Sequence, residues 1–311
     1  MPTTLEFLHA LAEETGEYGS FTTTSSGSTS SLVCSKLVNN ALAASEFANM
    51  YVLIESGDAI GEVGQAKTLV RSTGALSISD VFTATIASGV TFSLYRLLPP
   101  IDGDNVLPSY LKVVNWALKR IPVERTISFS GVTGQHYYTV SQSTYPWFTD
   151  EERIRWIEYP TTAADDIPRR MAYEDWEWDT NGSTRRLYFR SAPFQTGETF
   201  TVKVMAPGNS ILKKNGTWTE QTTQTAGLSL YTSGVADEAL PDVDDVVTMG
   251  TALLFRALSR INQPSSTVAA WLAKAAPSFR AARKLQHTGI PEDRTTGITR
   301  MRPVRVGYRG R

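Results

Sequence analysis

Hydrophobic and polar positions recur with two different periods along the chain, and one of them is helical. Leucines and an alanine return every three or four positions in residues 4–15, which predicts an amphipathic helix. The same spacing predicts a second helix at 108–120, with Pro108 in its first turn. Residues 233–286 show this period on both sides of a Pro-Ser break, so we expect an antiparallel helical hairpin there.

The other period is that of β-strands, in which every second side chain is apolar. Short apolar stretches separated by glycine-containing turns fill residues 49–98, a spacing typical of a small barrel or sandwich. In residues 123–232 the dipeptide Asn181-Gly182 separates two alternating runs and indicates a hairpin. Residues 126–141 also read as two strands around a turn, so this region is predicted to be an antiparallel β-sandwich.

Together these patterns predict an α+β fold that is mostly antiparallel β, with a helical hairpin and an extended C-terminal tail. At 311 residues the chain is long enough for two or three modest domains. The predicted parts are an N-terminal helix at 1–20, a small β-barrel module at 21–98, a linker and helix at 99–122, an antiparallel β-sandwich at 123–232, a helical hairpin at 233–286 and an extended basic tail at 287–311.

The composition is that of an ordinary globular protein, with 41% hydrophobic and 20% charged residues. No apolar run approaches the ~18 residues that span a bilayer, and the N-terminus has acids where a signal peptide has basic residues. We therefore expect a protein made in a cytoplasm, with no membrane partner. The one cysteine, Cys34, excludes an intramolecular disulfide and a cysteine-based metal cluster.

Charge is unevenly distributed along the chain. The segment Arg280–Arg311 holds nine basic and two acidic residues, a net charge of +7. The whole chain has a net charge of −1, so the remaining residues have a net charge of −8. Glycines and prolines follow Leu285, and the segment has too few apolar residues for a core of its own. A basic arm on an acidic body predicts that the tail docks on another surface; a solubilising tail without a partner is the alternative.

The residues that catalysis or metal binding would need are scattered. The three histidines, His9, His136 and His287, lie in well-separated segments, and no pair has the spacing of metal ligands. The chain has no phosphate-binding glycine motif and no G-x-S-x-G nucleophile elbow. The sequence thus predicts a protein that is not an enzyme and has no catalytic residues, metal or cofactor.

Two acidic stretches and a group of tryptophans allow more than one interpretation. The carboxylates between Asp150 and Asp179 are interleaved with arginines, which favours a solvated strand face with cross-strand ion pairs over a glycosidase pair. The acids between Asp237 and Asp245 fit a helix N-terminus, or one half of an intersubunit charge contact. Sandwich core is the favoured role of four tryptophans, with a carbohydrate platform as the alternative: Trp147, Trp156, Trp176 and Trp178.

The order of the predicted elements resembles that of the neck proteins of tailed bacteriophages, the head-to-tail adaptors. Residues 51–97 resemble a β module of phage adaptor and tail proteins. The likeness is carried by the Gly57-Asp58 turn, Gly61, Val70-Arg71, the alternating Leu76 and Ile78, and a closing strand with Gly89, Phe92 and Leu94. The helical pair at 242–285 with its basic arm resembles the adaptor part that meets the portal ring.

This resemblance implies a structural virion protein of the neck, assembled in the host cytoplasm. It implies a homo-oligomeric ring of ~12 copies, with the portal protein on one side and a tail terminator or tail tube protein on the other. DNA would pass through transiently and without specificity, because an acidic wall repels phosphate. The portal would be contacted by tail residues that pair with carboxylates or fill small pockets: Arg294, Arg300, Met301, Arg302, Arg305, Tyr308, Arg309 and Arg311.

Two other functions stay open on the sequence. A phage tail, baseplate or fibre protein could bind a surface glycan through its β-sandwich. A nucleic-acid binder could use the basic tail, with an affinity that falls steeply as the salt concentration rises.

Overall fold

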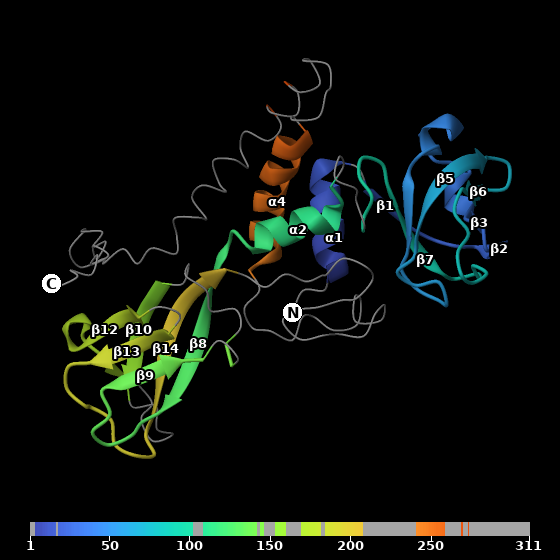
Figure 1. Ribbon diagram of the computed structural model, residues 1–311. Coiled ribbons are helices and arrows are strands. Elements are labelled where there is room, and N and C mark those ends of the chain that lie inside the picture. The colour runs from blue at the N-terminus through green and yellow to red at the C-terminus, as the bar shows by residue number, and fades with distance from the viewer. Residues whose placement is uncertain are drawn as a thin grey trace.

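The computed structural model describes residues 4–16, 18–101, 108–141, 144–145, 153–159, 169–181, 184–207 and 241–258, with the single positions 269 and 273. Within these residues the fold is α+β and mostly antiparallel β, as the sequence predicts. Helices occupy the middle of the molecule, and a β module lies on each side of them (Figure 1). The predicted tail at 287–311 lies outside the described residues, and so does nearly all of the second helix of the predicted hairpin.

Three helices from distant parts of the chain share one hydrophobic core. They are α1 (Thr4–Thr15), α2 (Tyr110–Leu118) and α4 (Val243–Leu258). Where α1 and α4 approach each other, a Cβ on Gly250 would lie 3.1 Å from a methyl carbon of Leu11, so the glycine permits this close packing. The predicted N-terminal helix is confirmed, and α4 confirms the first helix of the hairpin. Among the described residues, no helix is long and apolar enough to cross a membrane.

The start of α2 differs from its prediction. Ser109 is the N-cap residue, and its Oγ accepts a hydrogen bond from the backbone N–H of Lys112 at 3.1 Å. Pro108 therefore precedes the cap, and its predicted place in the first helical turn is wrong. Serine is favoured at the N-cap because its side chain accepts a hydrogen bond from a backbone N–H that would otherwise have no partner at the start of the helix.

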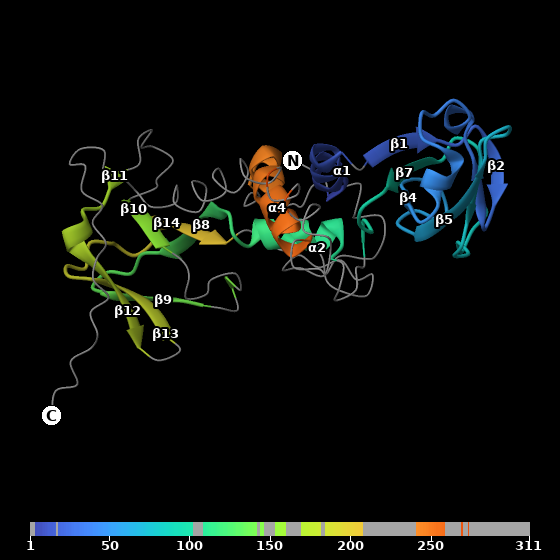
Figure 2. The same cartoon turned by 90° about the horizontal axis from the view of Figure 1, so that it is seen from above.

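The first β module is a seven-stranded antiparallel sheet in the order β1-β7-β4-β5-β6-β3-β2. Figure 2 shows this module next to α1, with β1 leading into it. Its elements are β1 (Tyr18–Thr22), β2 (Ser25–Ser28), β3 (Ser31–Val33), the 3-10 turns η1 (Ser35–Leu37) and η2 (Ala44–Phe47), β4 (Tyr51–Ile54), β5 (Val63–Val70), β6 (Ala75–Ile78) and β7 (Thr91–Tyr95). A bulge between Ala66 and Thr68 divides β5. Within β5, residues 63–65 pair with β4 and residues 66–70 pair with β6, so the sheet bends around its own core.

The predicted small barrel is an open sheet in the structure. Within residues 18–101, β1 and β2 lie at the two ends of the strand order and do not pair with each other. They are consecutive pieces of one segment, separated only by Thr23 and Thr24. The sheet also starts at Tyr18, well before residue 49, where alternation becomes visible. Strands β1 and β2 cannot be predicted from the sequence pattern, because serine, threonine and glycine predominate in them and none of their positions is fully buried.

The helices and the first β module are packed together as one unit. Leu53, Tyr95 and Leu98 of the module belong to the core that the three helices build. A second core, which includes Phe47 and Phe92, fills the bend of the sheet itself. The sheet therefore contacts apolar side chains on both of its faces.

The predicted β-sandwich is confirmed as two antiparallel sheets over one core. One has the order β11-β10-β14-β8 and the other the order β12-β13-β9. The elements are β8 (Pro122–Ser130), β9 (Tyr137–Val140), β10 (Arg153–Tyr159), β11 (Arg169–Arg170), the 3-10 turn η3 (Tyr173–Asp175), β12 (Trp176–Asn181), β13 (Thr184–Phe189) and β14 (Thr199–Pro207). Strands β12 and β13 pair up to Asn181 opposite Thr184, which confirms the predicted hairpin.

The two strands read around the turn in residues 126–141 do not pair with each other. Strand β8 pairs with β14 in one sheet, and β9 pairs with β13 in the other. The segment is therefore a crossover between sheets and not a hairpin. Its strands separate because Ile127 and Tyr138 both bury their side chains in the core between the sheets.

Candidate functional site

The portal-docking residues predicted from the sequence, from Arg294 to Arg311, lie outside the described residues. In the described part, polar and aromatic side chains gather at three other places. These are the junction of α1 with the first β module, the loop that follows η1, and the outer face of the four-stranded sheet of the sandwich.

Metal-ligand side chains do not gather in the part of the chain that the structure describes. No group of three or more His, Cys, Asp or Glu residues there could hold a metal ion. His136 donates from Nδ1 to the carbonyl oxygen of Phe189 at 2.8 Å, so it fixes the start of β9 against β13. Cys34 is buried, and His287 lies outside the described residues.

At the helix–sheet junction, polar contacts tie α1 to its neighbours. Nε2 of His9 lies 2.7 Å from Oε1 of Glu55, whose side chain is only 6% exposed. The ring of Tyr18 packs on His9, with 4.5 Å between the ring centroids. Oγ1 of Thr15 lies 3.1 Å from the hydroxyl of Tyr110 and links α1 to α2. The junction thus supplies the partner that a buried carboxylate requires.

The phenol of Tyr18 remains protonated at neutral pH. Burial raises its pKa from 10.0 to about 12. A hydrogen bond with Ser20 opposes this shift, and the carboxylates of Glu55 and Glu13 add to it. Tyr18 therefore acts at this junction as a neutral packing group.

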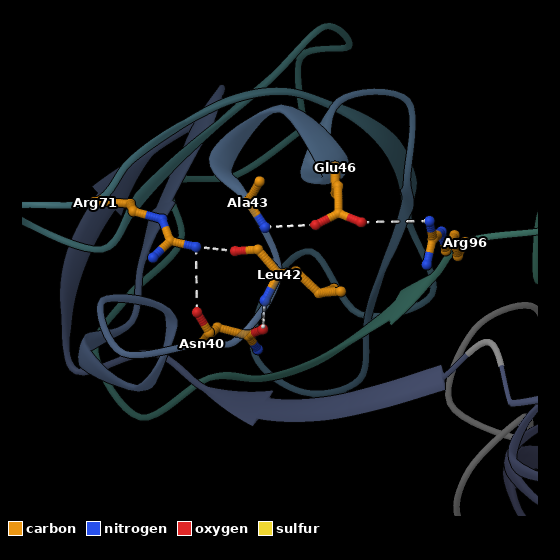
Figure 3. Close-up of polar contacts among 6 residues, drawn as sticks. All are labelled: Asn40, Leu42, Ala43, Glu46, Arg71 and Arg96. Carbon is orange, nitrogen blue, oxygen red and sulfur yellow. Dashed lines mark hydrogen bonds and ion pairs between the residues drawn. The ribbon is translucent and has the colours of Figure 1, made fainter.

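The loop that follows η1 is held against the first β module by charged side chains (Figure 3). The guanidinium of Arg71 donates to the carbonyl oxygens of Asn40, at 3.2 Å, and of Leu42. The carboxylate of Glu46 accepts a backbone N–H at the start of η2 at 2.5 Å and pairs with Arg96 at 3.6 Å. Because these groups satisfy the loop itself, we assign them a structural role.

The described tryptophans do not assemble into one carbohydrate platform. Trp176 is buried in the sandwich core, and Trp178 packs against the same core. Trp156 belongs to the other sheet and lies opposite Lys203, on its outer face. Trp147 lies outside the described residues. The core interpretation is therefore confirmed for the two tryptophans of the hairpin.

Side chains of four strands surround Trp156, and we call this surface the Trp156 face. Its members are Glu124 and Thr126 of β8, Arg155, Trp156 and Glu158 of β10, Arg170 of β11, and Thr201 and Lys203 of β14. The guanidinium carbons of Arg155 and Arg170 lie 4.6 and 4.1 Å from the centre of the indole ring, within range of cation–π attraction. The indole Nε1 donates to Glu158 at 2.8 Å, and the hydroxyl of Thr201 donates to the same carboxylate at 3.2 Å.

The cations of the Trp156 face differ in their partners. Arg155 pairs with Glu124 at 2.7 Å. Nζ of Lys203 donates to the hydroxyl of Thr126 at 2.9 Å, which leaves its charge uncompensated. Arg170 is exposed and lies on the indole, and it forms no ion pair with any described residue. The face thus presents two cations without a carboxylate partner beside a half-buried tryptophan.

Among the described residues, the ion pairs of the acidic stretch between Asp150 and Asp179 have partners outside it. Glu177 pairs with Arg190 at 2.9 Å, and Arg155 pairs with Glu124, so each pair includes a residue from outside the stretch. Both pairs are solvent-exposed, as predicted. Arg190 directly follows β13, the hairpin partner of β12, and Glu124 lies on β8, which β14 separates from β10 in the same sheet.

The acids at the start of α4 carry no ion pair within the described part of the chain. Asp242 and Asp244 are exposed, and Asp245 is half-buried. Burial raises the pKa of Asp245, and the neighbouring carboxylates of Asp242 and Asp244 raise it further. Asp244 and Asp245 lie in the first turn of α4 and Asp242 directly precedes it, which agrees with the prediction of helix N-terminal charges. Asp237 and Glu238 lie outside the described residues.

Sequence analysis missed two buried arginines of the sandwich. Arg125 of β8 is 5% exposed and Arg185 of β13 is 8% exposed. A signal exists for Arg125, because it shares the alternating register of Val123 and Ile127, which both face inward. Because arginine is rarely buried, its charge did not favour an inward-facing side chain for Arg125.

Comparison with known proteins yields no relative on which a function could be based. No family model, no curated protein and no solved structure matches the chain.

Proposed function

We propose that this protein is a structural component of a virus particle, a head-to-tail adaptor that forms a ring between portal and tail. The observation that carries the proposal is the layout of a central helical layer with a β module on each side (Figure 1). The three helices come from the beginning, the middle and the end of the described chain. A close-packed layer of this kind deforms little, which suits a subunit that must hold two binding modules between two partners.

The charge on α1 supports a role for the helical layer as a channel wall. Glu6, Glu13 and Glu14 are exposed on this helix, and the helix contains no lysine or arginine. Carboxylates repel the phosphate backbone, so a ring lined by such helices would let DNA slide without holding it.

The basic tail supplies the contact with the portal in this proposal. Its arginines recognise carboxylates through paired N–H donors, and its sparse apolar residues, such as Met301 and Tyr308, fill small pockets. One arm of this composition binds weakly, because ordering it costs entropy. A ring that presents many arms at once binds tightly through effective concentration.

The test begins with the mass of the purified full-length protein and negative-stain images of it. We expect rings, and mixing with the portal ring of the same virus should join the two. Deletion of residues 287–311 should leave the melting temperature of the body near that of the full chain and abolish attachment to the portal. A protein that stays monomeric at all concentrations and in the presence of portal would refute the adaptor proposal.

A matched pair of tail variants separates docking from general charge. Replacement of Arg300, Arg302 and Arg305 by lysine keeps the charge but loses the paired donors, and replacement by glutamine loses both. We expect portal binding to fall in the lysine variant and to vanish in the glutamine variant. If the tail instead confers DNA binding with a steep salt dependence, the nucleic-acid function replaces the adaptor.

A further inference from the structure

The Trp156 face has the composition of a protein-binding surface. Tryptophan and arginine are the residues most enriched among those that dominate binding energy at interfaces. Here one tryptophan lies beneath two guanidinium groups, at 4.1 and 4.6 Å from its ring centre. The internal bonds of Trp156 to Glu158 and of Arg155 to Glu124 hold these groups in place before any partner arrives.

Apart from the Arg155–Glu124 pair, this face carries the two cations Arg170 and Lys203 against the single carboxylate of Glu158, so its net charge is positive. Arg170 and Lys203 lack a carboxylate partner among the described residues, and the carboxylate of Glu158 is satisfied by two neutral donors. A partner with clustered carboxylates would therefore be favoured, and a basic partner would be repelled.

The chain itself carries such a cluster at the start of α4. Asp242, Asp244 and Asp245 lie within four residues and form no ion pair with a described residue. Their mutual repulsion contributes to the raised pKa of Asp245, so a cation brought beside them from outside would relieve an existing strain. Within one copy, no ion pair joins these acids to the Trp156 face among the described residues.

We propose that neighbouring copies of this protein contact each other through these two surfaces, with the Trp156 face of one copy bound to the acidic first turn of α4 in the next. The inference rests on the proposed ring and names its subunit contact. Two different surfaces meet in it, so the contact is heterologous, and such a contact closes into a ring when its rotation allows. Arg170 and Lys203 provide the cations, and Trp156 supplies the apolar centre.

Charge reversal on each side tests the contact. The full-length Arg170→Glu and Asp244→Lys variants should each raise the concentration for half-assembly by about tenfold or more in sedimentation velocity and native mass spectrometry. The double variant restores opposite charges across the contact, with their signs exchanged. It should assemble within about threefold of the natural protein. Rescue of this kind would not follow if either residue acted only on the stability of its own copy.

Two further variants serve as controls. Lys67→Glu makes the same charge change at an exposed position of β5, in the other module, and should assemble like the natural protein. Trp156→Phe keeps an aromatic ring and should assemble better than Trp156→Ala. Melting curves and circular dichroism of each variant show whether its copies are folded.

The outcomes separate this inference from the proposed function. If the natural protein forms rings and the single reversals assemble equally well, the contact is wrong and the adaptor proposal stands. The same conclusion follows if the double variant assembles no better than the worse single variant. If the natural protein never forms an oligomer, with or without portal, the proposed function fails together with this contact.

Discussion

Removal of the His9 side chain tests whether the helix–sheet junction holds α1 in place. Glu55 directly follows β4 and has a side chain that is 6% exposed, and its carboxylate lies 2.7 Å from Nε2 of His9. In His9→Ala the carboxylate stays buried and loses this partner. Tyr18 also loses the ring on which it packs.

The magnitude follows from the burial of the pair. A hydrogen bond to a charged group contributes roughly 1.5–3 kcal/mol, and an abandoned buried charge costs more. His9 is 23% exposed, so water can enter its place and hydrate part of the carboxylate. We therefore expect His9→Ala to lower the free energy of unfolding by about 2 kcal/mol. In a packed unit of this size that corresponds to a fall of roughly 4–8 °C in melting temperature.

The assay is a double-mutant cycle followed by thermal denaturation at neutral pH. Glu55→Met replaces the carboxylate with an apolar side chain of similar length and should remove most of the penalty of His9→Ala. The two changes should then be coupled by at least about 1 kcal/mol. His136→Ala removes a histidine that binds a backbone carbonyl in the sandwich, and it should show no coupling to Glu55→Met. A melting temperature of His9→Ala within about 1 °C of the natural protein, or additive effects in the cycle, would refute this account of the junction.

Three other changes have defined outcomes. Gly74 has φ +68°, and a Cβ there would lie 2.1 Å from the carbonyl oxygen of Cys34, so Gly74→Ala should cost on the order of 3 kcal/mol in thermal denaturation. Gly61→Ala, at φ +83° in open space, should cost only about 1 kcal/mol, and equal effects would count against the clash. Because the folded pKa of Tyr18 is about 12, stability from this group is complete below pH 10 and is lost as the pH rises from 10 to 12. Melting curves over that range should fall less steeply for Tyr18→Phe than for the natural protein. The raised pKa of Asp245 penalises its charged form in the fold, so Asp245→Asn should raise the melting temperature at pH 7 and change little near about pH 3; a lower melting temperature at pH 7 would contradict the sign.

Local patterns predicted elements well where apolar residues mark one face. Helix α1 follows from leucines at helical spacing, and the β12–β13 hairpin follows from the alternating runs around Asn181-Gly182. Strands β1 to β3 gave no such signal, because serine, threonine and glycine predominate in them and few of their positions are buried. They become strands because β7 and β6 offer them backbone partners, which is a property of the folded sheet.

The candidate surfaces could be predicted even less well from local sequence patterns. The sequence shows a tryptophan among arginines and acids at 153–158, but it does not tell which of its neighbours share its face. Arg170 and Lys203 reach Trp156 only because β11 and β14 flank β10, and the bulge between Ile154 and Trp156 shifts the register at this point.

The sequence by itself determined the period of each segment, the fold class, the sandwich and the separation of a basic tail from an acidic body. These properties depend on interactions between residues close in the chain and on total composition. The tertiary structure alone decided that β8 and β9 belong to opposite sheets, that the first sheet stays open, and which charges meet. Those outcomes depend on long-range pairing, in which every strand has several possible neighbours and only the burial of the whole core selects among them.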